Sequence, residues 1–512
     1  MNSSKTFDQV TLEFLTERNT ALLLERILTT SREITNADAG SLFLVEEEGG
    51  DKHLVFKLTQ NDSHSVPFSS FKMDIDTHSI VGYAAATGQI LNIKDAYRIR
   101  NLPFQLNRDF DQKFGYRTKS MLIIPMKNQK DEVIGVLQLV NAKRHRESKV
   151  TSPEAVAKEI ISFSQLHQEQ VSSLTTHAAV ALENNMLRRN IEDVFDGFAG
   201  ASVTPIGSRD PATFGHSERV AKLTVALAEA VDRTDSGPYK DVHFNREDIR
   251  EIQYASLLHD VGNFGVREEV LVKAKKLYPA QLELIKKRFQ YIRNLIERES
   301  SRKKLDYLVR NGNQNFKDFF AEIDADQFRQ FQTLGEFLNT IQQANDPTVL
   351  NEKPLERLVE IAGWTFQTPS GPTEPLLTQE ELQLLSITKG SLTMEERMQI
   401  ESHVIHSFRF LSQIPWTKDL RRVPEIATAH HEKLDGSGYP YHMKGDQIPF
   451  QSKMLAIADM FDALTDHRPW RRAFTVEEAL DIMREEVKWE LLDPGLFQLF
   501  VDSKVYQLTA KA

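Results

Sequence analysis

Two stretches decide the fold of the second half of this chain: LLHDVGN at residues 257–263 and HHEKLDGSGYP at residues 430–440. Apolar residues recur every three to four positions from Ile249 to Leu258, and this pattern stops at Gly262. Such a period predicts an amphipathic helix that ends on His259 and Asp260. We therefore expect His259 and Asp260 to lie at the end of a packed helix.

The remaining candidate residues also fall on predicted helices. His216 begins one helix, His403 lies inside a predicted helix over residues 393–414, and Asp459 lies on a final helix beside Asp462. Imidazole and carboxylate ligands without thiolates favour first-row divalent ions such as iron, manganese, nickel or zinc. The residue types therefore indicate a metal site.

The doublets His259-Asp260 and His430-His431 indicate two ions and not one. Adjacent residues on a helix point about 100° apart, so a doublet cannot easily bind a single ion. It can face two ions a few ångströms apart, with the aspartate between them. Sites of that kind activate water for in-line attack on a phosphodiester. His406 and His442 are interpreted as ordinary core or surface histidines.

Composition excludes several classes of function. The chain has 512 residues, with 63 Lys+Arg against 73 Asp+Glu and a net charge of −10, so no global basic field attracts DNA. It has no cysteine, which excludes disulfides, thiolate zinc sites, iron–sulfur clusters and cysteine nucleophiles. No apolar run approaches the roughly 18 residues of a membrane span, so we expect a cytoplasmic protein.

The first third of the sequence predicts a mixed α/β domain. The predicted strands are Ser41–Val45, His53–Leu58, Ser120–Met126 and Glu132–Asn141. A helical pattern then runs over residues 171–197 without proline and reaches Gly197. Two interpretations of this helix stay open: it packs on its own copy in a dimer, or it is the last helix of the first domain and ends there.

The motifs of the second half resemble those of HD-GYP domains, the branch of the HD phosphohydrolases that degrades cyclic di-GMP. The matching stretches are DPATFGHSERV (210–220), LLHDVGN (257–263), His403 after LTMEE, HHEKLDGSGYP (430–440) and ADMFDALTDHRPWR (458–471). The resemblance implies two divalent metals, iron or manganese before nickel or zinc, with Asp260 bridging them. The metal ligands that it implies are His216, His259, Asp260, His403, His430, His431 and Asp459.

The same resemblance implies a substrate-binding surface around the metals. A loop at Gly438, Tyr439 and Pro440 should lie beside the site, and Arg468 and Arg471 should reach the substrate phosphate. Arginine suits that task because its planar guanidinium matches the geometry of phosphate oxygens.

Two positions depart from the family pattern. The usual H-D-x-G-K motif places a lysine where this chain has Asn263, close to the catalytic Asp260. An amide carries no positive charge, and loss of one such donor commonly costs about a hundred- to a thousand-fold in rate. Some members hold a third metal with a glutamate four residues before the first histidine. That position is Ala212 here, so we expect two metals.

The first third resembles a GAF domain, a small-molecule sensor module. The matching stretches are ADAGSLFLV (37–45), SIVGYAAATGQILNIKDAY (79–97), FGYRTKSMLIIPM (114–126) and VIGVLQLVNAK (133–143). The cyclic-nucleotide-binding subset carries an N-K…F-x-x-x-D-E signature. This chain keeps Asn141 and Phe163, but it has Ala142 and His167-Gln168 at the other positions. We therefore expect a ligand of unknown identity, or a dimerisation module without one.

Together these patterns predict a multidomain protein. A GAF domain with an antiparallel sheet flanked by helices occupies residues 1–190 and ends in the linker helix. An all-α HD-GYP domain occupies residues 200–512, with a helical insertion at about 277–390. The predicted function is GAF-regulated hydrolysis of cyclic di-GMP to linear pGpG, with GMP as a further product. One alternative is an impaired receptor that binds cyclic di-GMP, or a protein partner at the GYP face; another is a different cyclic dinucleotide substrate. A homodimer is expected.

Overall fold

The computed structural model describes residues 7–65, 68–100, 102–209, 215–347, 352–368, 371–468 and 471–509. Ala212, and with it the test of a third metal, lies outside these ranges. The chain forms two compact units, Met1–Phe195 and Asp196–Ala512. Within the described ranges, none of the helices combines the length and the apolar character that crossing a bilayer requires.

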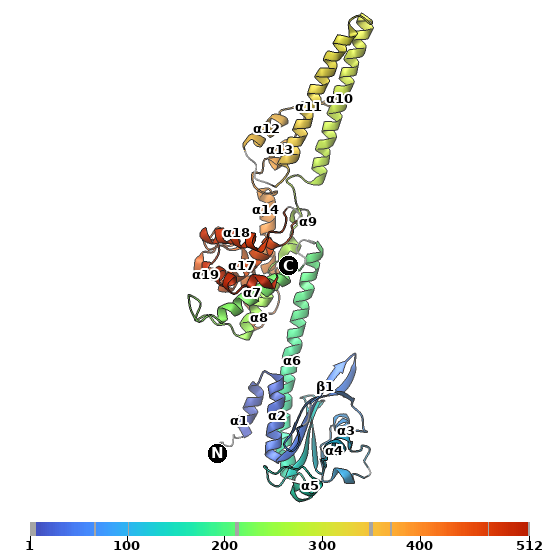
Figure 1. Ribbon diagram of the computed structural model, residues 1–512, viewed down its shortest axis with the longest axis vertical. Helices are drawn as coiled ribbons and strands as arrows, with labels where there is room; N and C mark the ends of the chain where they lie inside the picture. The colour runs from blue at the N-terminus through green and yellow to red at the C-terminus, as the bar shows by residue number, and fades with distance from the viewer. Residues whose placement is uncertain are drawn as a thin grey trace. The chain divides into compact units, whose positions relative to one another are not determined.

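An antiparallel sheet forms the centre of the first unit (Figure 1). Its strand order is β3-β2-β1-β6-β5-β4, and β7 pairs with β6. The strands are β1 (Ala37–Glu48), β2 (Asp51–Asn61), β3 (Lys72–Asp74), β4 (Leu91–Ile93), β5 (Met121–Lys127), β6 (Val133–Lys143) and β7 (Ile160–Ile161). The four strands predicted from the sequence correspond to β1, β2, β5 and β6.

Helices cover both faces of this sheet because each face is apolar. The helices of the first unit are α1 (Phe7–Thr16), α2 (Thr20–Thr35), α3 (Ile80–Thr87), α4 (Asp109–Phe114), α5 (Pro153–Glu159) and the amino-terminal part of α6 (Gln165–Arg209). One core joins α2, the sheet and α6 through residues such as Leu28, Leu139 and Leu182. A second core, which includes Ala84 and Ile123, joins α3 to the opposite face.

The two residues that match the cyclic-nucleotide signature serve the fold of the first unit. The Asn141 side chain accepts a hydrogen bond from the backbone N–H of Lys119 at 2.7 Å and donates one to the carbonyl of Arg117 at 3.0 Å. Phe163 is buried in the core beneath α6. Neither side chain is therefore available as a ligand contact.

The second unit is helical (Figure 1). Its helices outside the insertion are α7 (His216–Asp232), α8 (Arg246–Leu258), α9 (Glu268–Leu271), α14 (Met394–Glu401), α15 (His403–Leu411), α16 (Val423–Thr428), α17 (Phe450–Thr465), α18 (Val476–Lys488) and α19 (Pro494–Asp502). Short 3₁₀ segments η3 (Val261–Gly265) and η5 (Ala429–His431) carry site residues. The core includes Leu223, Ile252, Phe461 and Met483.

The prediction of one continuous helix over residues 393–414 is wrong. The capping box of Thr393 and Glu396 does open a helix, but α14 ends before Ser402 and α15 begins at His403. The Ser402 hydroxyl donates to the carbonyl of Gln399 at 2.6 Å. Side-chain donors of this kind satisfy carbonyls at a helix end, which lets the chain turn there.

The insertion has a hydrophobic core of its own. Its helices and strands are α10 (Pro279–Asn311), α11 (Phe316–Ala344), α12 (Glu352–Ala362), β8 (Thr365–Gln367), β9 (Thr373–Pro375) and α13 (Gln379–Leu385). The long helices α10 and α11 form a hairpin (Figure 1), and the core contains Phe289, Phe337, Ile341 and Leu385. The strands β8 and β9 pair with each other, and β9 forms the end of the turn-forming sequence at 368–375. All the predicted metal ligands lie outside the insertion.

Candidate metal centre

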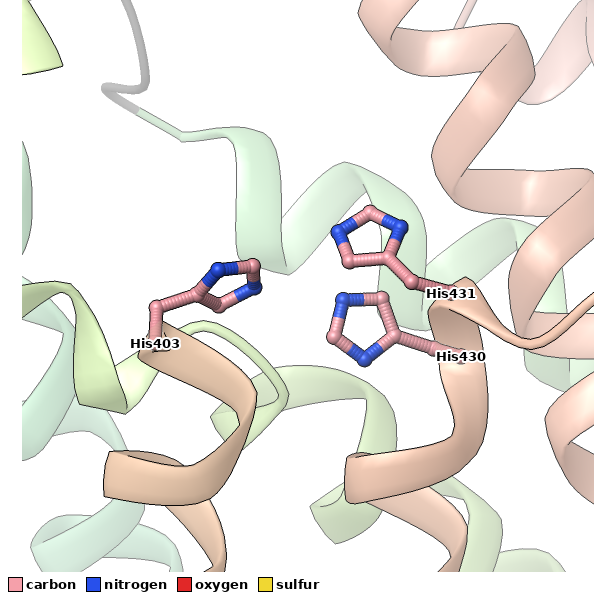
Figure 2. Close-up of side chains that lie close together, drawn as sticks. All are labelled: His403, His430 and His431. Atoms are coloured by element: carbon pink, nitrogen blue, oxygen red, sulfur yellow. The ribbon is translucent and has the colours of Figure 1, made fainter. Parts of the chain in front are cut away.

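The seven predicted metal ligands converge in the second unit, although they come from five separate segments. His216 begins α7, His259 and Asp260 follow α8, His403 begins α15, His430 and His431 lie in η5, and Asp459 lies in α17. Two groups have all their ligand atoms within 4.8 Å of one another: His403, His430 and His431, and His216, His259 and Asp260. Figure 2 shows the first group, with the ring of His403 directed toward the two adjacent histidines of the other segment.

The Asp260 carboxylate belongs to the second group but also faces histidines of the first. Its Oδ1 is 3.1 Å from Nε2 of His403 and 3.9 Å from Nε2 of His430, whereas its Oδ2 is 3.6 Å from Nε2 of His259. A second carboxylate, Asp459, places Oδ1 3.1 Å from Nε2 of His216 and 3.7 Å from Nε2 of His259. Asp260 therefore lies within 4 Å of histidines from both groups.

Three of the histidines are held in the same orientation by the backbone. In His259, His403 and His430, Nδ1–H donates to the carbonyl three residues earlier, at 2.7, 2.7 and 2.5 Å respectively. The Nε2 atom of each ring is buried and has no hydrogen-bond partner. Leaving such an atom unpaired costs about 1–3 kcal/mol, and a histidine whose Nδ1 is held by a carbonyl presents Nε2 to a metal. The donor set therefore fits metal ions.

His216 is oriented by side chains instead. Its Nδ1 lies 2.7 Å from Oδ2 of Asp462. Arg219 donates to both oxygens of Asp462, at 2.7 and 2.9 Å, and also to Asp466 at 2.5 Å. A carboxylate behind a ligating histidine fixes the ring and raises its basicity. Sequence reasoning noted Asp462 only as a neighbour of Asp459, because its contact with His216 spans 246 residues.

The glycine of the H-D-x-G motif permits close packing behind the site. A Cβ at Gly262 would overlap the carbonyl oxygen of His403 and the backbone nitrogen of Ser407. The buried Ser407 hydroxyl donates to the carbonyl of His259 at 2.7 Å and accepts from the N–H of Gly262 at 2.8 Å. Ser407 thus joins the HD segment to α15. Sequence reasoning missed it, although its position four residues after His403 places it on the same helix face.

The predicted GYP loop lies beside the histidines. The ring centroid of Tyr439 is 4.8 Å from that of His431 and 6.5 Å from that of His403. A Cβ at Gly438 would overlap the backbone of Glu432 and Lys433, so only glycine fits there. The loop and the η5 segment are therefore packed against each other, and Tyr439 forms part of the wall of the site.

The predicted substrate-binding residues have other partners in the structure. The Arg471 guanidinium donates to the carbonyls of Ala463 and Leu464 at the end of α17, at 2.6 and 3.1 Å, and lies 4.3 Å above the Phe474 ring. The backbone of Arg468 pairs with that of Arg471. Asn263 is half-buried in η3, where its N–H donates to the carbonyl of Asp260 at 3.0 Å.

Burial and charge set the protonation of the ligands. Burial opposes ionisation of Asp260 and Asp459, but the surrounding imidazoles hold the pKa of both carboxyls well below the usual value. Burial, together with neighbouring imidazoles, lowers the pKa of His430 well below its usual value, and burial lowers the pKa of His431 to about 4. These groups are therefore in the protonation states that metals require.

Burial acts to lower the pKa of His403, but the contact with Asp260 outweighs burial and raises this pKa. The pKa of His216 is raised as well. Burial acts to lower this pKa, but hydrogen bonds to Asp459 and Asp462 outweigh burial and raise the pKa of His216 to about 10. A metal ion at His216 would take the place of that proton, because metal binding to histidine releases protons.

Comparison with known families agrees with this division into an α/β unit and a helical unit. Residues 19–182 match the model of the GAF domain. Residues 213–332 and 380–496 each match a model described as HD domain. The chain therefore contains a GAF domain followed by an HD region.

Relatives of the chain are phosphodiesterases by name. It is 39% identical over 122 residues to a 3′3′-cGAMP-specific phosphodiesterase 1 of Vibrio cholerae serotype O1, a match that covers 23% of this chain and 28% of that protein. It is 37% identical over 112 residues to a cyclic di-GMP phosphodiesterase of Thermotoga maritima, which covers 22% of this chain and 30% of that protein. The chain thus spans less than a third of the length of either relative. A solved structure of a GAF domain/HD domain protein from Geobacter sulfurreducens aligns with a TM-score of 0.24 and 14% identity, covering 35% of this chain and 98% of that one.

Proposed function

We propose that this chain is a metal-dependent cyclic dinucleotide phosphodiesterase of the HD-GYP type, which hydrolyses cyclic di-GMP to linear pGpG under the control of its GAF domain. The observation that carries the proposal is the set of three buried, unpaired Nε2 atoms of His259, His403 and His430 around the Asp260 carboxylate. The names of the two relatives support the substrate class.

The proposed cofactors are two divalent ions, iron or manganese before nickel or zinc. His403, His430 and His431 would hold one ion, and His216, His259 and Asp459 the other, with Asp260 shared. Bound ions of this kind lower the pKa of water and offset the charge of a phosphodiester. Nitrogen and oxygen donors without thiolate suit these first-row metals.

The chain's own residues would orient the substrate and keep the ligands ionised. Arg468 and Arg471 are the proposed phosphate contacts, and Tyr439 would close one side of the site. Asn263 can donate a hydrogen bond to a phosphate oxygen, but its amide cannot supply a proton to the leaving 3′ oxygen. In this proposal that proton comes from solvent.

We also propose a role for each domain of the chain. Residues 1–190 would form the GAF sensor with the linker helix at about 171–197. Residues 200–512 would form the HD-GYP domain, with the insertion at about 277–390 serving no catalytic role. A small-molecule ligand of the GAF domain and a protein partner at the GYP face complete the proposed interactions.

A second candidate function is a receptor that binds a cyclic dinucleotide without cleaving it. Asn263 favours this candidate, because it replaces the positive charge expected next to Asp260. The intact ligand set favours the enzyme.

Turnover with two substrates separates these candidates. Protein reconstituted with iron or manganese would be incubated with cyclic di-GMP or 3′3′-cGAMP, and the products separated by chromatography, with metal-stripped protein as the control. Linear dinucleotide formed only by the metal-loaded protein supports the enzyme, and the faster substrate defines its specificity. Bound but intact nucleotide supports the receptor. If the metal-loaded protein neither binds nor cleaves either nucleotide, both candidate functions are contradicted.

A further inference from the structure

The insertion leaves and rejoins the rest of the helical unit at one buried cluster. Lys273 follows α9, just before the insertion begins, and Glu396 lies in the first turn of α14, just after the insertion ends. The Lys273 ammonium donates to both oxygens of Glu396, at 2.8 and 2.7 Å, and only 2% and 10% of the two side chains is exposed. Tyr278, at the start of the insertion, donates its hydroxyl to the same carboxylate at 2.7 Å. We call Lys273, Tyr278 and Glu396 the root cluster.

The root cluster joins the two chain segments that carry Asp260 and His403. Lys273 comes 13 positions after Asp260, through η3 and α9. Glu396 comes seven positions before His403, through α14. Oδ1 of Asp260 lies 3.1 Å from Nε2 of His403, although the two residues belong to different ligand groups. The ion pair therefore connects these segments at a second point, in addition to the contacts that Ser407 makes.

Stability alone does not explain a buried ion pair at this place. Apolar side chains of similar volume are often as stabilising as a buried ion pair or more so, whereas a fully hydrogen-bonded pair fixes one geometry. Both oxygens of Glu396 are used, because the carboxylate also accepts the N–H of Thr393 at 2.9 Å. Burial opposes ionisation of Glu396, but its hydrogen bonds with Lys273 and Thr393 hold its pKa below the usual value. The carboxylate therefore fixes the direction in which α14 runs from the root toward His403.

Tyr278 connects the root cluster to the body of the insertion. The preceding residue, Leu277, is buried in the insertion's own core, and its N–H donates to the Asn345 side chain at the end of α11 at 2.7 Å. The following residue, Pro279, is the first residue of α10. A shift of the insertion as one body therefore moves the Tyr278 hydroxyl relative to Glu396.

We propose that the root cluster is a positioning device, which sets the separation of Asp260 and His403 and makes that separation respond to the position of the insertion. This inference rests on the proposed function, because it takes both residues as metal ligands. Tyr278 and Glu396 are positioning residues, since they act through α14 and not by contact with metal or substrate. Coupling between two sites is reciprocal, so metal binding should also stabilise the contact between α14 and the insertion.

The metal affinity of two conservative variants tests the proposal. Tyr278→Phe removes only the hydroxyl that reaches Glu396, and Glu396→Gln removes the charge of the carboxylate. Tyr307→Phe is the matched control, because its hydroxyl donates to the carbonyl of Gln314 at 2.9 Å, inside the insertion and 29 positions after Tyr278. Manganese affinity of the full-length chain would be measured by competition with a chelating dye, and thermal unfolding would show that each variant is folded. We expect the affinity to fall about tenfold in Tyr278→Phe and about 10- to 100-fold in Glu396→Gln, as for groups behind metal ligands, and to stay unchanged in Tyr307→Phe.

Hydrogen exchange provides a readout that a general loss of stability would not reproduce. In the wild type, manganese should slow amide exchange both in α14 and in the first turns of α10. In Tyr278→Phe the slowing should persist in α14 and be lost in α10. If Glu396→Gln does not fold, Tyr278→Phe alone decides the outcome.

The results separate this inference from the proposed function. A folded Tyr278→Phe that binds manganese as the wild type does, or whose α10 is still slowed by manganese, overturns the role of the root cluster even if the chain cleaves cyclic dinucleotides. The expected differences in affinity and exchange support that role even if the chain cleaves none, which would contradict only the proposed function. A wild type that binds no manganese overturns both.

Discussion

The two units each bury a cluster of ionisable side chains, but they satisfy them differently. In the first unit, Asp38 is fully buried and accepts from the Tyr116 hydroxyl at 2.8 Å and the Ser63 hydroxyl at 2.7 Å. Lys143 completes this cluster, with Nζ 3.4 Å from Asp38 and 2.9 Å from Asp62. In the second unit, Asp260 is surrounded by three imidazole Nε2 atoms that have no hydrogen-bond partner.

The difference shows which property of a buried polar cluster indicates a ligand. Buried polar groups are normally paired, and a buried pair can be purely structural. The Asp38 cluster is closed, since its acceptors and donors match one another. In the cluster around Asp260, the Nε2 atoms that converge on the carboxylate have no hydrogen-bond partner, and a metal ion would supply that partner.

Removal of the central carboxylate should have the largest effect. Asp260→Asn keeps the shape of the side chain but removes the charge that faces both histidine groups. We expect turnover to fall by about a thousand-fold, at the upper end of the loss seen for one preorganised electrostatic group. Turnover and bound metal would be measured on the same sample. An Asp260→Asn protein with wild-type turnover contradicts the bridging role.

Restoring a positive charge beside Asp260 should raise turnover. Asn263→Lys introduces an ammonium group where the family motif has one, and we expect a gain of about a hundred-fold in the rate of cyclic dinucleotide cleavage. Asn263→Gln is the matched control, because it lengthens the side chain without adding charge. Equal rates in the two variants would show that the charge at this position is unimportant.

Loosening His216 should have a smaller effect. Asp462→Asn removes the carboxylate that holds Nδ1 of His216, and changes behind a ligating histidine typically cost about 10- to 100-fold in metal affinity or activity. Asp466→Asn is the control, because it disturbs Arg219 but keeps the contact between Asp462 and His216. Metal affinity, measured by competition with a chelating dye, separates positioning from stability. Equal affinities in the two variants would contradict the role of Asp462.

Disruption of the closed cluster should change stability without changing the chemistry. Asp38→Asn leaves Lys143 without one of its two carboxylates, and breaking a buried pair costs about 3–5 kcal/mol. Urea unfolding should show that loss in the first unit, whereas metal content per folded chain stays at the wild-type value. Asp74→Asn, an exposed change in β3 of the same unit, should leave both unchanged. Loss of metal in Asp38→Asn would contradict the claim that the Asp38 cluster has a purely structural role.

Local sequence patterns, together with the resemblance to HD-GYP domains, predicted which residues converge at the candidate site. The H-D and H-H doublets at helix ends, with His216, His403 and Asp459 at the starts or faces of other helices, already predicted convergence. The strands β1 and β2 were predicted at their centres but too short. Their ends contain residues such as Gly40 and Asn61 that are weak strand formers, and pairing with neighbouring strands extends them.

The remainder of the site depends on contacts that local patterns do not contain. The apolar period continues across the helix break at Ser402, where the side chains of Ser402 and His403 donate to the carbonyls of Gln399 and Ile400. Asp462 contacts His216 across 246 positions of the sequence. Ser407 contacts His259 across 148 positions and Gly262 across 145. The packing of α17 on α7, and of α15 on the segment that follows α8, brings those groups together.

The metal content of the anaerobically purified chain tests the central claim most directly. Metal would be measured by mass spectrometry in the wild type, in His403→Asn and in His442→Asn. His403 is a predicted ligand, whereas His442 is an exposed histidine and serves as the control. The backbone φ of His442 is 56°, a value that asparagine also tolerates. We expect about two first-row metal ions per chain in the wild type and in His442→Asn, as in a two-metal site, and about one fewer in His403→Asn. A wild type without bound metal, or the same content in both variants, would contradict the central claim.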